Sequence, residues 1–184
     1  MEVNGLIGTK DSWMEFSEEG YLIRQGNSNA CGVAANYNVL RYFDMIDPGY
    51  AEFFRLYGEM VARKLAMPDG STSSLSQTRF LEPLGLWVYI AELDEYSRGQ
   101  LERDINNPGL AFVFGVDSEH FWLNQKPVGQ PHEDHVITVF HAGPKTFSGI
   151  DPADGRKRWP KEQVYGSSRV ALIISRSPLY GEGR

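Results

Sequence analysis

Residues 25–43 read QGNSNACGVAANYNVLRYF, and the interpretation of the whole chain depends on this stretch. Its first half is rich in Gly, Asn and Ser, which is typical of a tight loop that can cap a helix. From Ala30 to Phe43, apolar residues recur at close to the helical period. We therefore expect a mostly buried helix that carries Cys31 in its first turn.

Cys31 is the single cysteine of the 184 residues, so no disulfide can form within the chain. A cysteine reacts as its thiolate, and the first turn of a helix favours negative charge through its free N–H groups and its dipole. We expect Gly32, the next residue, to leave space for a substrate backbone. The alternative for a lone cysteine is a small apolar core residue without a chemical role.

Gln25 lies six residues before Cys31. Attack of a thiolate on an acyl carbon creates an oxyanion, which needs hydrogen-bond donors already in place. The amide of Gln25 could supply one donor and the backbone N–H of Cys31 the other. Taken without Cys31, Gln25 would be an ordinary residue of a surface loop.

A histidine is the expected base because its ordinary pKa is near neutrality. Of the four histidines, His135 opens the apolar run VITVF and would be held by a rigid strand. His120 and His132 fall in the polar stretch 117–134, and His141 ends the strand. We favour His135, with His132 as the second choice.

Asp151 is the candidate for the third member of a triad, which accepts the other N–H of the histidine and fixes its tautomer. It ends the apolar run that begins at Phe147 and precedes Pro152. A short Gly-Pro turn would place this strand beside the strand of His135. The alternative is that the Asp-Pro sequence forms only a turn.

The remaining pattern predicts helices first and an antiparallel sheet afterwards, an α+β fold. A long loop is expected at 117–134, where Trp122 would line or cover a cleft and Asp134 would join Gly32 and Trp122 in binding substrate. The other expected elements are helices at 47–65, 74–84 (capped by Ser74 and stopped by Gly85) and 97–105, and strands at 86–90, 110–116, 135–141, 147–150 and 170–175.

With these residues in hand, the chain resembles the peptidase family that cleaves double-glycine leaders from bacteriocin precursors. The resemblance rests on Gln25, Cys31-Gly32, His135 and Asp151-Pro152 in that order, and covers roughly residues 22–175. It implies a papain-like cysteine peptidase fold, with N-terminal helices packed on a C-terminal antiparallel sheet in one domain (1–184, core about 22–175). It also implies a Cys-His-Asp triad that hydrolyses a peptide or isopeptide bond in a protein or peptide substrate.

Three departures from that family limit what is carried over. Its members are usually fused to membrane transporters, the segment between the glutamine and the cysteine lacks an acidic residue here, and the loop before His135 is long. The fold and the triad are therefore carried over, and leader cleavage is not. A role as a bacterial effector or toxin, with an immunity or host target protein as partner, is a further expectation.

Other chemistry remains open from the residues alone. The same triad serves an acyltransferase or a thioester or amide hydrolase, and a catalytically silent binding module would keep the fold without turnover. A metal site built from His132, His135 and an acidic neighbour (Glu133 or Asp134) is disfavoured, because Pro131 and the strand that follows argue against the helix it needs. We expect no metal and no cofactor.

Composition restricts the class of protein. A hydrophobic fraction of 41% and an aromatic fraction of 12% are typical of a globular protein. The net charge of −6 argues against nucleic acid or an anionic membrane as the main partner. No apolar run approaches the roughly 18–20 residues of a membrane span, and no signal peptide is recognisable. A cytoplasmic location, with export by a signal-less route as an option, is the expectation.

Overall fold

The structure is a computed structural model that describes residues 29–123, 132–153 and 155–179, apart from the side chains of residues 155–157. In chain order its elements are α1 (Cys31–Tyr42), α2 (Tyr50–Ala62), α3 (Ser74–Leu81), the 3₁₀ turn η2 (Glu82–Leu84), β1 (Trp87–Glu92), α4 (Arg98–Ile105), β2 (Leu110–Val116), α5 (Ser118–Leu123), β3 (His135–Ala142), β4 (Thr146–Asp151), β5 (Gly155–Pro160), α6 (Lys161–Ser167) and β6 (Val170–Ser175).

The strands form one six-stranded sheet in the order β1-β6-β2-β3-β4-β5, and every neighbouring pair is antiparallel. β2 runs through the middle of this sheet, and all seven of its residues are buried. Because side chains alternate along a strand, Ala111 and Val113 face one side while Phe112 and Phe114 face the other. Each face of the sheet therefore carries its own hydrophobic core.

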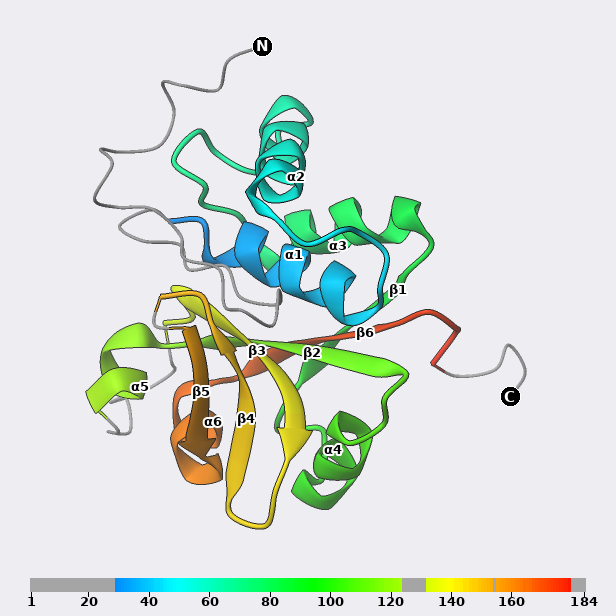
Figure 1. The fold of residues 1–184 in the computed structure, drawn as a ribbon. Coiled ribbons are helices and arrows are strands. Elements are labelled where there is room, and N and C mark those ends of the chain that lie inside the picture. The colour runs from blue at the N-terminus through cyan, green and yellow to red at the C-terminus, as the bar shows by residue number, and fades with distance from the viewer. Residues whose placement is uncertain (1–28, 124–131, 154, 180–184) are drawn as a thin grey trace.

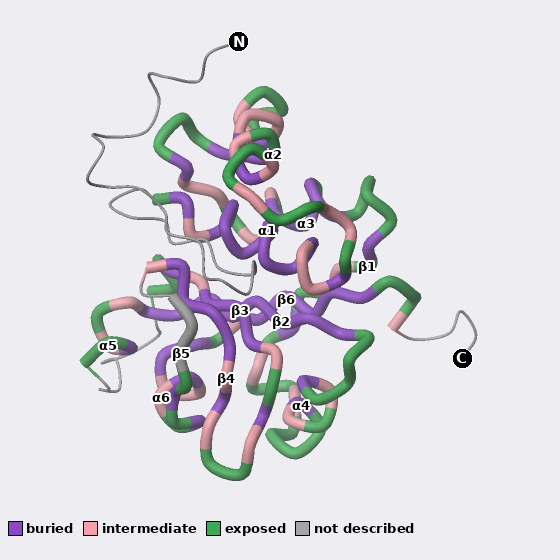
Figure 2. Tube along the Cα trace, viewed as in Figure 1, coloured by how far each residue is buried: buried purple, intermediate pink, exposed green. Residues whose placement is uncertain are grey.

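Helices cover both faces (Figure 1). α1, α2 and α3 pack on one face in a core with Tyr37, Phe53 and Phe80 at its centre. α4 and α6 pack on the opposite face, where Leu101 and Val164 join the phenylalanines of β2. Figure 2 shows the buried segments concentrated in α1 and the central strands. The expected α+β arrangement, with N-terminal helices on an antiparallel sheet, is confirmed.

α1 is the most deeply buried helix, with nine of its twelve residues buried. It lies across β3 and also contacts β2. This packing brings the first turn of α1, and with it Cys31, to the end of the sheet where β3 begins.

Helix ends follow local side-chain chemistry. The hydroxyl of Ser73 accepts a hydrogen bond from the backbone N–H of Ser76, so the cap of α3 lies one residue before the expected Ser74. Ser97 caps α4 in the same way through the N–H of Gln100. Gly85 ends η2 with φ +87°, a left-handed conformation that glycine adopts without strain.

One expectation from the sequence was wrong, and two elements were not predicted. The stretch 117–134 is not wholly a loop, because it contains α5, whose Phe121 is fully buried. The turn after Asp151 is present, but the sequence pattern did not predict β5 and α6, which follow it. A helix of six residues is too short to show a helical period, and the basic run of β5 hides its strand character.

Candidate active site

Cys31 is the first residue of α1, and its side chain is half-buried. Its sulfur lies 4.0 Å from the carbonyl oxygen of Asn29. The first backbone N–H groups of a helix have no partner within the helix, so they favour a thiolate or an oxyanion at this position. Cys31 is therefore placed where a nucleophile could act, and its role as the nucleophile stays a prediction.

A loop between α2 and α3 supports the residues just before Cys31. Asn29 donates from its side chain to the carboxylate of Asp69 at 3.0 Å and from its backbone to the carbonyl of Asp69 at 3.2 Å. Gly70, with φ +93°, packs so closely on Ala30 that a Cβ there would lie 2.7 Å from the Cβ of Ala30. The sequence suggested only a turn at this loop.

His135 and Asp151 meet across neighbouring strands. His135 is the first residue of β3 and Asp151 the last of β4, and the antiparallel pairing of β3 with β4 brings these two ends together. Nε2 of His135 lies 2.8 Å from Oδ1 of Asp151. The two residues are 4% and 0% exposed, so bulk water competes little for this contact.

The pKa values of His135 and Asp151 are shifted by burial and by the contacts between the site residues. Burial alone would lower the pKa of His135, but hydrogen bonds with Asp151 and Cys31, together with their charges, raise this pKa to about 9. Burial would likewise raise the pKa of Asp151, but His135 holds it below its usual value. Because Asp151 takes Nε2, Nδ1 is the ring nitrogen left for the sulfur of Cys31. At neutral pH His135 is therefore protonated, an imidazolium beside the sulfur of Cys31.

Trp122 covers the histidine and the aspartate. Its ring centroid is 5.4 Å from that of His135, and its Nε1 lies 3.4 Å from Oδ2 of Asp151. Trp122 itself is 51% exposed. Its indole therefore stands between solvent and the His135–Asp151 pair, and a role of Trp122 in binding substrate stays a prediction.

At position 32, close packing within the protein requires glycine, whereas the sequence suggested that glycine leaves space for a substrate backbone. A Cβ at this position would lie 2.2 Å from Cγ2 of Thr72 and 3.1 Å from the side-chain nitrogen of Gln77. The room that the missing side chain leaves is filled by the loop before α3 and by α3 itself. Contact between Gly32 and substrate stays a prediction.

Asp134 is one of two carboxylates that join the two ends of the 117–134 segment. Its carboxylate accepts hydrogen bonds from the backbone N–H and the hydroxyl of Ser118, both at 2.8 Å. It thus holds the start of α5 directly beside His135. A role of Asp134 in binding substrate stays a prediction, and both its carboxylate oxygens already have a partner.

Asp117 is the second carboxylate that joins the two ends of this segment. Its Oδ1 lies 2.6 Å from Nδ1 of His120, and its Oδ2 accepts from the backbone N–H of His132 at 2.9 Å. The hydrogen bond with His120 is the main cause that lowers the pKa of Asp117 to about 2. Asp117 is buried and ties both ends of the segment together. No periodic pattern in the sequence indicated this role of Asp117.

The structure does not place the remaining candidates His120, His141 and Gln25 beside Cys31, His135 and Asp151. The imidazole of His120 pairs with the carboxylate of Asp117, and His141 is exposed on β3. Gln25 lies outside the described residues, so its role as an oxyanion donor stays a prediction. Among the residues that the structure describes, no group of three or more metal-binding side chains comes together, and no helix has the length and apolar character to cross a membrane.

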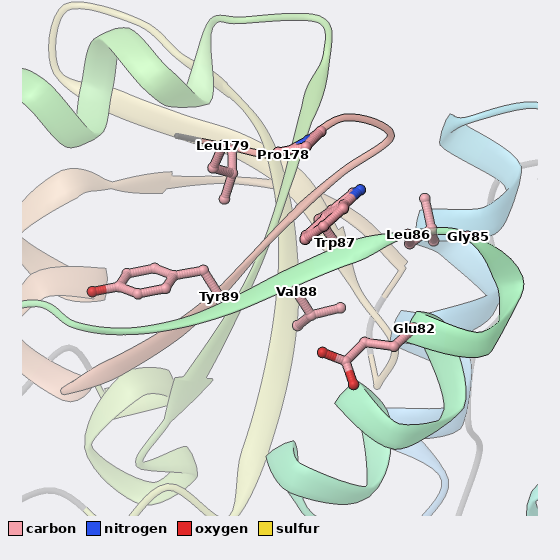
Figure 3. A pocket seen from close by; sticks show the side chains of 8 residues that line it. All are labelled: Glu82, Gly85, Leu86, Trp87, Val88, Tyr89, Pro178 and Leu179. Atoms are coloured by element: carbon pink, nitrogen blue, oxygen red, sulfur yellow. The ribbon is translucent and has the colours of Figure 1, made fainter. Parts of the chain in front are cut away.

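A pocket of about 490 Å³ lies elsewhere, along β1 (Figure 3). It contains none of the three residues Cys31, His135 and Asp151. The candidate site is therefore defined by its chemistry and not by the shape of this pocket.

Comparison with solved structures shows which fold this is. The chain is similar to a double-glycine-motif protease from an AMS/PCAT transporter, solved in complex with a leader peptide (TM-score 0.59, 15% identity, 92% of this chain and 97% of that one). It is also similar to the peptidase domain of Streptococcus ComA, a bifunctional ABC transporter of a quorum-sensing pathway (TM-score 0.51, 12% identity, 84% and 96%).

The class defined by this likeness is the papain-like fold of these peptidase domains, as expected from the sequence. At 12–15% identity the likeness establishes the fold alone. Neither a family model nor a curated protein sequence matches the chain.

Proposed function

We propose that this chain is a cysteine peptidase that hydrolyses a peptide or isopeptide bond through Cys31, His135 and Asp151. The observation that carries the proposal is the buried 2.8 Å contact between Nε2 of His135 and Oδ1 of Asp151, together with the interaction with Cys31 that helps to raise the pKa of the same imidazole. The order nucleophile, base and orienting carboxylate is the one that thiol-dependent hydrolysis requires.

In the proposed mechanism, the Cys31 thiolate attacks the carbonyl carbon and the electron pair of the C=O bond moves onto its oxygen. The first-turn N–H groups of α1 and the amide of Gln25 stabilise this oxyanion. The His135 imidazolium donates a proton to the leaving amine as the C–N bond breaks. Water, deprotonated by the neutral imidazole, then hydrolyses the thioester and restores Cys31. Asp151 keeps the ring aligned in every step.

A peptide substrate is supported by the solved relative that holds a leader peptide. Peptides with a double-glycine cleavage site are therefore the first substrates to test. Action as an effector or toxin, and an immunity or host target partner, stay predictions from the sequence. Identification of cleaved protein ends in extracts treated with the active protein would test them.

The direct test compares the wild-type chain with Cys31→Ala on a fluorogenic double-glycine peptide library. Loss of the thiol should lower the hydrolysis rate by about 10³-fold or more, while Asp94→Asn, an exposed acidic residue on the loop after β1, should leave the rate unchanged. Hydrolysis that persists in Cys31→Ala would refute the proposal. Faster product formation with an added amine, and an amide product, would show acyl transfer instead.

A further inference from the structure

The two outer strands of the sheet differ in how they are protected. β5 carries Arg156, Lys157, Arg158 and Pro160, and charged residues and proline on an edge strand prevent another strand from adding to it. β1, at the other edge, reads Trp-Val-Tyr-Ile-Ala before its single charge, Glu92. Among the residues that the structure describes, no strand pairs with the outer side of β1, and an exposed apolar edge of this kind is rare in globular proteins unless something pairs with it.

Apolar side chains are exposed along this edge. Trp87, Tyr89 and Ile90 are 49%, 42% and 43% exposed. Every second residue of an edge strand also directs its N–H and C=O away from the sheet, where they can bind another backbone. β1 thus offers both backbone hydrogen-bonding groups and apolar contact surface.

The 490 Å³ pocket follows this edge. Five consecutive residues, 85–89, line it, together with Glu82 from η2 and with Pro178 and Leu179 beyond β6. Figure 3 shows Trp87, Pro178 and Leu179 on one side of the β1 ribbon, with Val88 and Glu82 on the other. The pocket is therefore lined by side chains from both sides of β1, next to the strand edge where a further strand would add.

The charges around the edge indicate the chemistry of the partner. Glu82 is the only charged residue among those that line the pocket, and it lies on the wall shared with Val88. Glu92, Asp94 and Glu95 follow at the far end of β1. A partner that alternates apolar and basic residues would place apolar side chains over Trp87 and Leu179 and a lysine or arginine near Glu82.

We propose that β1 is a docking edge for an extended protein segment of alternating apolar and basic residues, which adds to the sheet as a seventh strand. This surface is separate from the candidate active site, because β6 and β2 lie between β1 and β3. The proposal does not depend on the proposed peptidase activity and can be tested in the Cys31→Ala chain, which cannot cleave the probe by the proposed mechanism.

The probe is a fluorescein-labelled peptide of four Lys-Val repeats with blocked ends, and its binding to the full chain is followed by fluorescence anisotropy. The same peptide with every second amide N-methylated cannot form the strand hydrogen bonds and should bind at least tenfold more weakly. A peptide with Glu in place of Lys should also bind more weakly, and most clearly at low salt.

Variants locate the binding on β1. Trp87→Ser should weaken binding by about tenfold, whereas Met67→Ser, another exposed apolar residue, should not change it. Glu82→Gln should weaken binding about threefold at low salt, with Glu119→Gln, exposed on α5, as its control. Because the peptide comparison uses an unaltered surface, it remains decisive even if a β1 variant folds poorly.

Four results would overturn the proposal. Equal binding of the plain and N-methylated peptides would mean that no strand is added. Equal or tighter binding of the Glu peptide would refute the inferred charge of the partner, and no binding at millimolar peptide would refute the docking edge for this chemistry. A dimer that dissociates in Trp87→Ser, seen by sedimentation, would make a second copy of the chain the occupant.

Discussion

At the scale of single residues, the site depends on close packing around the first turn of α1. Gly32 is the tightest position, since a Cβ there would lie 2.2 Å from Cγ2 of Thr72. The side chain of Thr72 is held in place by its hydroxyl, which donates a hydrogen bond to the carbonyl oxygen of Leu65 at 2.6 Å. The methyl group of Thr72, and not the hydroxyl, is thus what excludes a side chain at Gly32.

Gly32→Ala should lower the free energy of unfolding by about 1–3 kcal/mol, the usual cost of overpacking a core. The double variant Gly32→Ala with Thr72→Ser removes the clashing methyl group, keeps the hydroxyl and should recover part of this loss. Urea unfolding of the wild type and of these two variants measures both effects. A Gly32→Ala chain as stable as wild type would contradict the packing described for α1.

A second prediction at this scale concerns the pKa of His135. Asp151→Asn removes the charge that helps to raise this pKa to about 9, so the pKa should decrease. An NMR titration of the imidazole measures the change, with Asp94→Asn as the control for a lost surface charge. An unchanged pKa in Asp151→Asn would show that the 2.8 Å contact does not govern the protonation of His135.

The same pKa makes stability depend on pH. Because the pKa of His135 is about 9 in the folded chain and 6.5 as its ordinary value, the protonated ring stabilises the fold in full below about pH 6.5. This contribution decreases as the pH rises and is gone above about pH 9. Thermal unfolding between pH 6 and 10 should therefore show falling stability in wild type and a flatter curve in Asp151→Asn. Equal slopes for the two chains would contradict this linkage.

At the scale of elements, α5 is positioned by two carboxylates that the sequence did not single out together. Asp134 binds Ser118 at the start of α5, and Asp117 binds His120 within it and the backbone N–H of His132, three residues before β3. Gln163 of α6 also donates to the carbonyl oxygen of Phe121 at 2.5 Å. These contacts place Trp122 over His135 and Asp151.

Asp117→Asn should loosen α5 without unfolding the sheet, because an amide cannot form the same ion pair with His120. Amide hydrogen exchange should become faster in residues 118–123, and exchange in α4 should stay as it is. Asp104→Asn, whose carboxylate accepts from Gln100 on the exposed side of α4, is the matched control. Unchanged exchange in α5 would mean that Asp117 is not what holds this helix.

Which elements could be predicted depended on the length and clarity of their pattern. β2 was predicted with its bounds, since seven apolar residues follow an Asn-Pro-Gly turn. α1 was predicted from its period, and its loop chemistry located the start. α5 was missed because its helix is one and a half turns long, and β5 because an outer strand with three basic residues has no apolar face to recognise.

At the scale of the whole molecule, the sheet order is what creates the site, and a single sequence contains no direct signal for it. The chain places β6, its last strand, between β1 and β2. β3 and β4 are neighbours in sequence and in space, so the meeting of His135 with Asp151 could be predicted. The approach of Cys31 depends instead on how α1 lies across β3, which follows from packing between distant segments.

The structure describes three of the four residues proposed to carry out catalysis. The helices, the sheet and the meeting of His135 with Asp151 are described by the structure, whereas Gln25 lies outside the described residues. That residues 1–184 form one domain stays a prediction. A Gln25→Ala chain that keeps Cys31 alkylation but loses peptide hydrolysis would support the oxyanion role, because alkylation by a haloacetamide creates no oxyanion.

The central claim is that the sulfur of Cys31 is activated by His135. Its most direct measurement is the second-order rate of Cys31 alkylation by iodoacetamide from pH 5 to pH 10, followed by intact mass. We predict a rate at pH 6 about tenfold or more above that of a free cysteine, and loss of this excess in His135→Gln. A rate that follows the pH dependence of a free thiol, equally in both chains, would contradict the account.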